Sequence, residues 1–516
     1  MKNLTKLLFV ATLLIAAQAC SDLIETETST SLPPEKALSE KEGVEALRAN
    51  LYGRIHSQAL STNYMLAPSA LADGLTNTEA ATRYRGYVTF GSGTNGSGVG
   101  TWAFSYNTIN IANILINKIS DGALDEATLK QFQGEALWFR AFGMHNLMKA
   151  YAFEPGMMPS SGKAAGWDWG IPLRLEGALT TENTKYHSRK KVNVVYDQII
   201  ADLKKSIEYL TGNDSGDTRY ITEAAAHALL ARVYLYAAGN ENQYPNAYEN
   251  ANQQAAKALQ TTKAKLVQPD GIAKMFDETA GLNPGAIFVG VIEPSTESVG
   301  VNDALNVYTA DQWVALVPTQ EIMDLYPDED ARLSWFAPCY NEANSKVPSG
   351  CVAHHSAIDY SEYSEPDEGQ GLEIQKWNAE AGQQADDVPY LRVAEMLLIQ
   401  AEARAKGANG NPLDPLNKLR KARGIDAYSG SDIMQAVLDE RRREFIAEGH
   451  RFWDLKRLGK DIPKVGSQIK FSPLNVPERI VYQTNYQMID KISSTQIQQS
   501  QDNAPEDSVL VQNPGY

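Results

Sequence analysis

The chain has 516 residues, of which 43% are hydrophobic and 21% charged, and its formal net charge is −16. This composition excludes a largely disordered chain and is that of a globular protein long enough for a large core or two merged domains. The negative charge repels polyanions, so nucleic acid is not an expected partner.

The first 19 residues have the pattern of a secretory signal peptide. Lys2 and Lys6 precede the apolar run Leu7–Ala17, which has about half of the roughly 20 residues that a membrane-spanning helix needs. Small residues then lead to Cys20, the position at which a bacterial lipoprotein signal places its lipidated cysteine. We therefore predict that residues 1–19 are removed and that Cys20 carries a lipid anchor, the alternative being an incidental cysteine.

Residues 20–42 are acidic, rich in Ser and Thr, and interrupted by two prolines, which predicts a tether. Helical periodicity dominates residues 43–260. One helix face is predicted by spacings of three and four among Trp102, Tyr106, Ile109, Asn113 and Ile116. Small residues recur at the same spacing in two other segments, at Ala251, Ala255 and Ala258 and again at Ala394, Leu398 and Ala401. Such helix pairs resemble tetratricopeptide repeats, so we predict a mostly α, degenerate tetratricopeptide-type array.

Periodicity lapses over residues 261–386, where "AIFVGVIEP" is strand-like and prolines and glycines are frequent. We predict a long irregular excursion with short strands, after which helices resume at "VPYLRVAEMLL" and continue to about Gly459, within a last region of helices and extended tail, 387–516. Cys339 and Cys351 frame a short polar segment of the excursion. In an exported protein they form a disulfide, or else they are two free thiols.

No motif in the chain predicts catalysis. "GSGTNG" matches the glycine pattern of a dinucleotide site after the strand-like "YVTF", but no helix begins within the glycines, so a loop is expected. His354 and His355 are adjacent and have no third ligand at a fixed spacing. Metalloprotease, phosphate-loop and nucleophile-elbow motifs are absent from the sequence. We predict no enzyme activity, no cofactor and no metal.

A charged helical stretch, "ERRREFIAEGHRFWDLKR", pairs acids and bases at spacings of three and four. The expected pairs are Glu440 with Arg443, Glu444 with Arg441, and Glu448 with Arg451, each an exposed pair contributing about 0.2–0.5 kcal/mol. We favour a structural ion-pair network over a groove for polyanions, because acids match the bases nearby.

Several segments together carry a resemblance to a known family: "GEALWFRAFGMHNLMKAYA", "ITEAAAHALLARVYLYAAG", "LRVAEMLLIQAEARAKG", "LNKLRKARGI", "ERRREFIAEGHRFWDLKRLG" and the terminal "QNPGY". Their order and spacing resemble the SusD/RagB family of outer-membrane lipoproteins of Bacteroidetes across nearly the whole chain. The resemblance implies a helical tetratricopeptide-type scaffold on the cell surface. It implies a SusC-like, TonB-dependent barrel as partner, and capture of oligosaccharides, or sometimes peptides, without cleavage. A tetratricopeptide scaffold that binds other proteins is the alternative from another class.

The resemblance places the ligand where N-terminal loops meet the excursion. A neutral sugar is bound by flat aromatic rings with amide or charged groups at its edge. The candidate ligand-binding residues are therefore Arg83, Tyr84, Tyr87, Trp102, Tyr308 and, first among them, Trp313. Trp102 and Trp313 fit a core position equally well. Trp167 and Trp169 form a second platform or fix their loop, and Trp138 and Trp453 are expected in the core.

Overall fold

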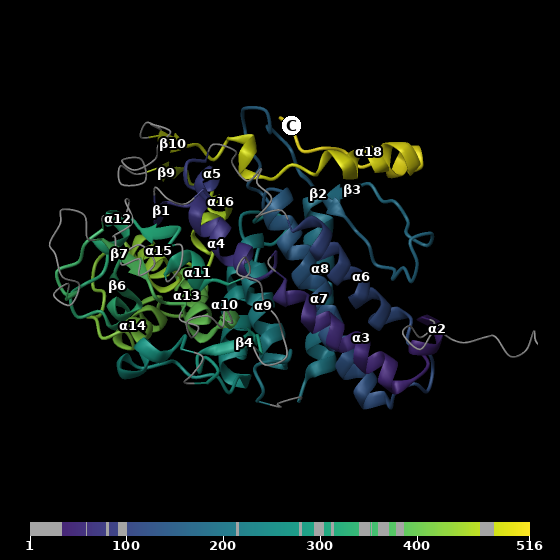
Figure 1. The fold of residues 1–516 in the computed structure, drawn as a ribbon, viewed down its shortest axis with the longest axis horizontal. Coiled ribbons are helices and arrows are strands. Elements are labelled where there is room, and N and C mark those ends of the chain that lie inside the picture. Colours follow the sequence, from purple (N-terminus) through teal and green to yellow (C-terminus); the bar gives the residue numbers. More distant parts are fainter. Residues whose placement is uncertain are drawn as a thin grey trace, which may run out of the picture.

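Helices that follow one another in the sequence lie side by side through much of the chain (Figure 1). The computed structural model describes residues 34–57, 59–78, 82–90, 101–212, 216–277, 281–293, 304–310, 314–339, 351, 353–359, 371–377, 386–464 and 479–516. Each of five helices packs on the next: α6 (Trp102–Asn117), α7 (Glu126–Tyr151), α8 (Val192–Leu210), α9 (Glu223–Ala237) and α10 (Ala247–Thr261). Stacked helical hairpins are the tetratricopeptide-type arrangement, so the predicted fold class is confirmed.

The array is interrupted after α10 and resumes more than a hundred residues later. Helix α13 (Val393–Ala405) packs directly on α10, and α14 (Leu413–Lys421) and α15 (Ile433–Glu444) pack on α13. The small residues predicted to allow close helix approach are buried on both helices, at Ala251, Ala255, Ala258, Ala394 and Ala401. The excursion is therefore an insertion between two helices that touch.

Side-chain caps fix where several of these helices begin. The carboxylate of Asp125 accepts a hydrogen bond from the Thr128 amide at 2.9 Å at the start of α7. Thr222 caps α9 and Asp432 caps α15 in the same way. Each cap satisfies one amide that the first turn of a helix leaves without an intrahelical partner.

The strands form short two-stranded antiparallel ladders: β1 (Leu75–Asn77) with β5 (Leu316–Pro318), β2 (Trp169–Pro172) with β3 (Arg189–Lys191), β4 (Ala286–Gly290) with β8 (Val388–Arg392), β6 (Phe336–Pro338) with β7 (Leu372–Ile374), and β9 (Ile462–Lys464) with β10 (Arg479–Val481). The β4–β8 ladder joins the two ends of the excursion. The β1–β5 ladder joins the N-terminal region to it, with Thr76 opposite Val317.

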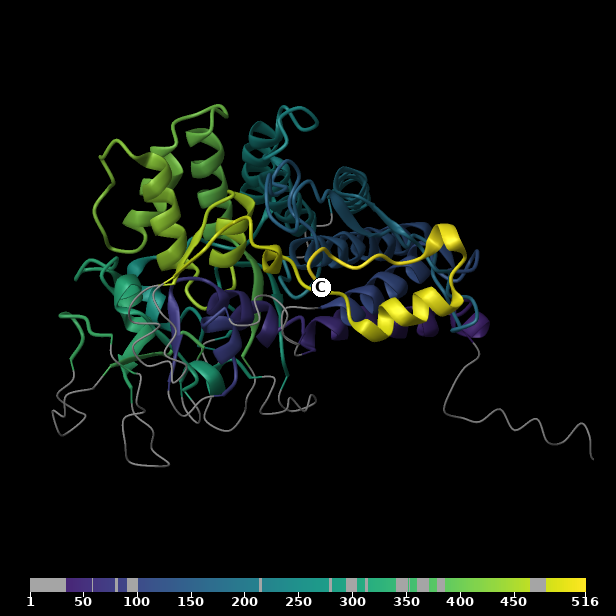
Figure 2. The same ribbon diagram turned by 90° about the horizontal axis from the view of Figure 1, so that it is seen from above.

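The remaining α-helices of the described ranges are α2 (Pro34–Ala37), α3 (Lys41–Gly53), α4 (Thr62–Leu71), α5 (Arg85–Val88), α11 (Asn306–Thr309), α12 (Gln320–Met323), α16 (Arg451–Arg457) and α18 (Ser494–Asn503). The C-terminal segment with α18, yellow in Figures 1 and 2, runs across the outside of the array. It is held by Asn513 of the "QNPGY" motif, whose amide donates to the carbonyls of Tyr151 and Asp490. No helix in the described ranges is long and apolar enough to cross a membrane.

Two local predictions are wrong. "VPYLR" is strand β8 rather than the start of a helix, because all five of its residues are buried and its backbone pairs with β4. Tyr87 and Val88 of the strand-like "YVTF" lie in helix α5. The predicted strand in "AIFVG" is confirmed as β4, and the glycines of "GSGTNG" lie outside the described residues.

The charged stretch forms an ion-pair network, but not the exposed one predicted. Only the Glu440–Arg443 pair of the three expected is found among the described residues, at 2.5 Å. Glu444 instead binds Arg392 and Arg423, and its side chain is fully buried. The expectation fails because helical spacing reveals neighbours on one helix and not partners brought in by the fold.

Within this stretch, "EGHR" connects α15 and α16 to the N-terminal region. A Cβ at Gly449, where φ is +75°, would lie 2.5 Å from the Tyr64 carbonyl oxygen, so only glycine fits there. Arg451 makes a bidentate pair with the buried Asp73, at 2.8 and 2.9 Å. The motif therefore holds the chain just before β1.

Candidate functional site

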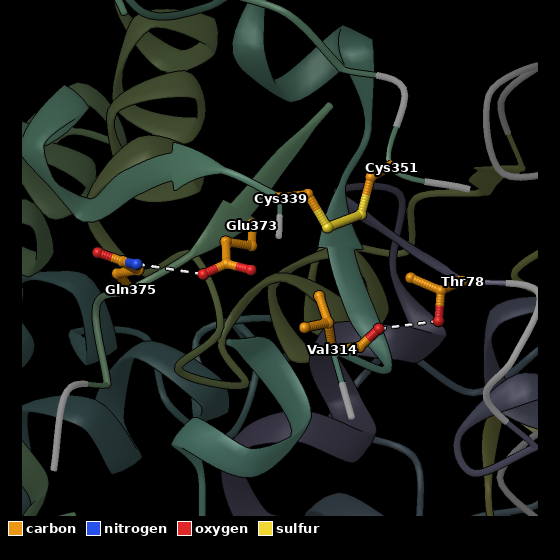
Figure 3. The surroundings of a disulfide bond; sticks show 6 residues. All are labelled: Thr78, Val314, Cys339, Cys351, Glu373 and Gln375. Carbon is orange, nitrogen blue, oxygen red and sulfur yellow. Dashed lines mark hydrogen bonds between the residues drawn. A yellow bond between two sulfur atoms is a disulfide. The ribbon is translucent and has the colours of Figure 1, made fainter. Parts of the chain in front are cut away.

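The N-terminal region and the excursion meet at the β1–β5 ladder. Beyond its end, the Thr78 amide donates to the Ala315 carbonyl at 3.2 Å, and the Thr78 hydroxyl donates to the Val314 carbonyl at 2.8 Å (Figure 3). The Asn77 side chain donates to the carbonyls of Arg83 and Ala315, at 3.0 and 3.1 Å. Two segments more than 200 residues apart are thus fixed to each other by buried polar side chains.

Four of the candidate residues form one cluster beside this ladder. The ring of Tyr84 meets that of Tyr308 edge-on, with centroids 5.4 Å apart, and lies 6.2 Å from the ring of Tyr87. The Arg83 guanidinium lies over the Tyr308 ring at 4.8 Å. The Tyr84 hydroxyl donates to the Asn63 side chain at 3.0 Å, which anchors the cluster to α4.

The backbone around the cluster is strained. Tyr84, Phe90 and Val314 have φ values of +63°, +51° and +36°, a region that residues other than glycine rarely adopt. Each such residue costs on the order of 1–3 kcal/mol, and such residues gather at ligand-binding sites, where the surroundings enforce them. Their concentration at the junction marks it as the candidate functional site.

Not every candidate can present a ring to a ligand. Tyr308 is fully buried, and Tyr84 and Tyr87 are 5% and 8% exposed, so their rings do not form an open platform in this structure. Burial raises the pKa of the Tyr84 hydroxyl far above its usual range, so this phenol stays neutral. Arg83 is half-buried, and the buried tyrosines position its guanidinium.

Trp313 lies outside the described residues. Its neighbour Val314 is completely buried in the left-handed conformation described above, and its carbonyl is held by Thr78. The point at which the chain leaves residues 311–313 is therefore fixed. Trp313 stays a prediction.

The other tryptophans named above have contacts of their own. Trp102 is half-buried and meets the rings of Tyr106 and Tyr151 edge-on, each at 4.9 Å, which is a packing role. Trp167 donates from its indole to Asn513 at 3.2 Å and so fixes the C-terminal tail, whereas Trp169 is 37% exposed beneath Lys191. Trp138 and Trp453 are buried, as predicted.

Cys339 and Cys351 are joined by a disulfide bond (Figure 3), the first of the two alternatives that the sequence left open. The two cysteines form a small buried apolar cluster with Val314 and Val317. The Cys339 amide also donates to the Gly371 carbonyl at 2.7 Å, next to β7. The bond therefore braces β5 and the residue that follows Trp313.

We predict that replacing both cysteines, Cys339→Ala with Cys351→Ala, lowers the free energy of unfolding by about 3 kcal/mol, because the cross-link restricts a 12-residue separation in the unfolded chain. Urea unfolding with and without dithiothreitol measures this. Dithiothreitol should lower the unfolding free energy of the wild type to that of the double variant. It should not change the unfolding free energy of the double variant itself. Equal stability of all four samples would contradict the prediction.

Sequence reasoning missed Asn63, Asn77 and Thr78, which hold the site together. A signal was present, since "DGLTNT" places polar residues directly after the apolar helix α4. A ring nitrogen of His355 bonds to the Tyr326 carbonyl at 2.9 Å. Within the described ranges, no group of three metal-ligating side chains comes together.

Comparisons with known proteins agree with this architecture. Residues 290–516 match the model of the SusD family, and residues 42–235 match a model described as starch-binding, associating with the outer membrane. "SusD-like protein P38" of Formosa agariphila is 23% identical over 407 residues, covering 71% of this chain and 73% of that protein.

Solved structures share the fold. A SusD superfamily protein from Bacteroides thetaiotaomicron superposes with a TM-score of 0.73 at 20% identity, over 92% of this chain and all of the other. A laminarin-binding SusD-like protein superposes with a TM-score of 0.65 at 18% identity, over 93% of this chain and all of the other.

Proposed function

The chain belongs to the SusD/RagB family, and on that basis we propose that it is a cell-surface lipoprotein that captures an oligo- or polysaccharide and delivers it to a SusC-like, TonB-dependent outer-membrane barrel. It binds without cleaving. The similar proteins support a glycan ligand, since one structural neighbour is described as laminarin-binding and one matching family model as starch-binding.

One observation carries the location of the site. The strained junction of the N-terminal region with the excursion gathers Arg83 and three tyrosines, and it fixes Val314, the residue that follows 311–313. In the proposed site, Trp313 supplies the aromatic face for the sugar ring and Arg83 donates to sugar hydroxyls. Tyr84, Tyr87 and Tyr308 are positioning residues.

We propose that residues 1–19 are the cleaved signal, that Cys20 carries the lipid, and that residues 20–42, which include α2, tether the body to the outer membrane. Delivery requires a barrel beside the protein. Purification of the lipidated full chain from membranes should bring a TonB-dependent barrel with it, and a Cys20→Ala variant should not be found in the membrane fraction. Absence of any barrel would contradict delivery.

The binding test is affinity electrophoresis of residues 21–516 in gels containing single polysaccharides, among them laminarin and soluble starch. We expect one glycan to retard the wild type, Trp313→Ala to lose at least tenfold in affinity, and Arg83→Ala to lose several-fold. Trp169→Ala alters the exposed tryptophan of the alternative platform and should bind normally if the junction is the site. No retardation by any glycan would contradict the proposal in favour of a peptide ligand.

A further inference from the structure

A second concavity lies on the helical array itself. It has a volume of about 420 Å³ and is formed by α8, the C-terminal half of α9, and the segment that leads into α10. Its size is within the usual range for small-molecule sites, roughly 300–1,000 Å³. None of the candidate residues discussed above lines it.

One wall of this concavity is fixed by hydrogen bonds. The Tyr244 hydroxyl lies 2.9 Å from the Asp197 carboxylate and 3.1 Å from the Asn193 carbonyl. The Gln243 amide donates to the other oxygen of Asp197 at 3.2 Å. The Tyr244 ring and the Gln243 side chain are therefore held in place before any ligand arrives, which reduces the entropy lost on binding.

Other polar groups facing the concavity are left without partners. Tyr234 is 6% exposed, and its hydroxyl makes no hydrogen bond to the described part of the protein. The side chains of Asn246, Asn250 and Lys204 line the same space and likewise make none within the described ranges. These groups can donate to and accept from a polyhydroxylated molecule.

The chemistry of the lining selects a neutral ligand. Lys204 and Asp197 are opposite in sign, so the site favours neither an anion nor a cation. The half-buried ring of Tyr244 offers a face to C–H surfaces, while the amides serve hydroxyl groups. Such a lining suits a sugar better than a peptide, whose extended backbone pairs best with a strand edge or a continuous groove.

We propose that this concavity is a second glycan subsite, which binds one or two sugar rings of the same neutral polysaccharide captured at the junction. The inference rests on the proposed function for its ligand class. Figure 2 shows the dark teal α9 and α10 at one edge of the molecule and the purple segments around α4 and α5 toward the opposite edge. A single polysaccharide chain long enough to reach both sites gains avidity by binding them together.

The test uses acetylation of lysines by an amine-reactive ester, measured by mass spectrometry on residues 21–516. Laminarin and soluble starch are the two probes. We expect one of them to slow acetylation of Lys204 at least threefold. Lys205, which pairs with Glu208 and does not line the concavity, should react at its usual rate and serves as the internal control.

The double variant Asn246→Ala with Asn250→Ala should abolish this protection while retardation in the gel persists through the junction. Gln253→Ala, an exposed change on the same helix outside the concavity, should keep the protection. Unchanged acetylation of Lys204 with both probes, or protection that survives in the double variant, would overturn the second subsite. Either result can occur while a glycan still retards the wild-type protein in the gel. In that case the proposed function remains supported and only the second subsite is rejected.

Discussion

Replacing Glu444 by glutamine is expected to lower the free energy of unfolding by about 4 kcal/mol. Its fully buried carboxylate contacts three guanidiniums: Arg392 at 2.9 Å, Arg423 at 2.8 Å and Arg332 at 3.1 Å. Removing one member of a buried charge network leaves its partners uncompensated, at a cost of roughly 3–5 kcal/mol. Urea unfolding at pH 7.5 measures the loss.

The matched control is Glu45→Gln, which alters a half-exposed pair with Lys41 at 3.6 Å. It should change stability by less than about 0.5 kcal/mol, because solvent screens such pairs. A similar small change for Glu444→Gln would contradict the central role of the network.

The dependence of the unfolding free energy on pH is a second test of the same network. Burial alone would raise the pKa of Glu444, but Arg423, Arg392 and Arg332 lower it well below its usual range; the pKa of Glu440 is lowered to about 2. Both groups contribute stability that is complete above the unfolded pKa of about 4.5 and is lost as pH falls toward 2. Wild-type stability should therefore fall steeply in this window, and the slope should be smaller in Glu444→Gln.

Replacing Lys456 by methionine is expected to cost about 4 kcal/mol. Its buried ammonium donates to the carbonyls of Lys149 and Ala152, at 2.6 Å each, and to Glu154 at 3.1 Å. The two carbonyls belong to the C-terminal end of α7, where a helix favours a cation. The variant loses this cap and leaves the Glu154 carboxylate buried without its cation.

Lys460→Met is the control for Lys456→Met, because Lys460 is exposed four residues further along. Burial already raises the pKa of Glu154 above its usual range, and losing Lys456 raises it further. A carboxyl group whose pKa is higher in the folded than in the unfolded state makes the protein less stable as pH rises. The loss of unfolding free energy in Lys456→Met should therefore be larger at pH 8 than at pH 5. Adding Glu154→Gln should remove that pH dependence; a deficit independent of pH in the single variant would contradict the explanation.

The scaffold could be predicted from sequence because its signals are local. The face shared by Tyr106 and Ile109, and the small residues of α10, need only helical spacing to be recognised. Strand β8 was missed because "VPYLR" runs directly into α13, and its partner β4 is about a hundred residues away. The partners of Glu444 were missed for the same reason, since Arg332 and Arg392 come from the excursion and its end.

The site could be predicted only as a region. The family resemblance brought together Arg83, Tyr84, Tyr87 and Tyr308, and the structure places these four side by side. Which of these side chains faces solvent depends on the left-handed backbone conformation at Tyr84 and Val314. Neither residue type predicts that conformation from the sequence. Sequence therefore identified the neighbours but not the direction of their rings.

The insertion of the excursion between α10 and α13 also governs the order in which the protein can fold. About 130 residues separate Thr261 from Val393, so closing this loop costs roughly 4 kcal/mol of chain entropy. This cost precedes the stabilisation that comes from packing α13 on α10. Until the excursion closes, the side of α10 that packs on α13 has no cover, and a chain that stalls at this stage exposes it to aggregation.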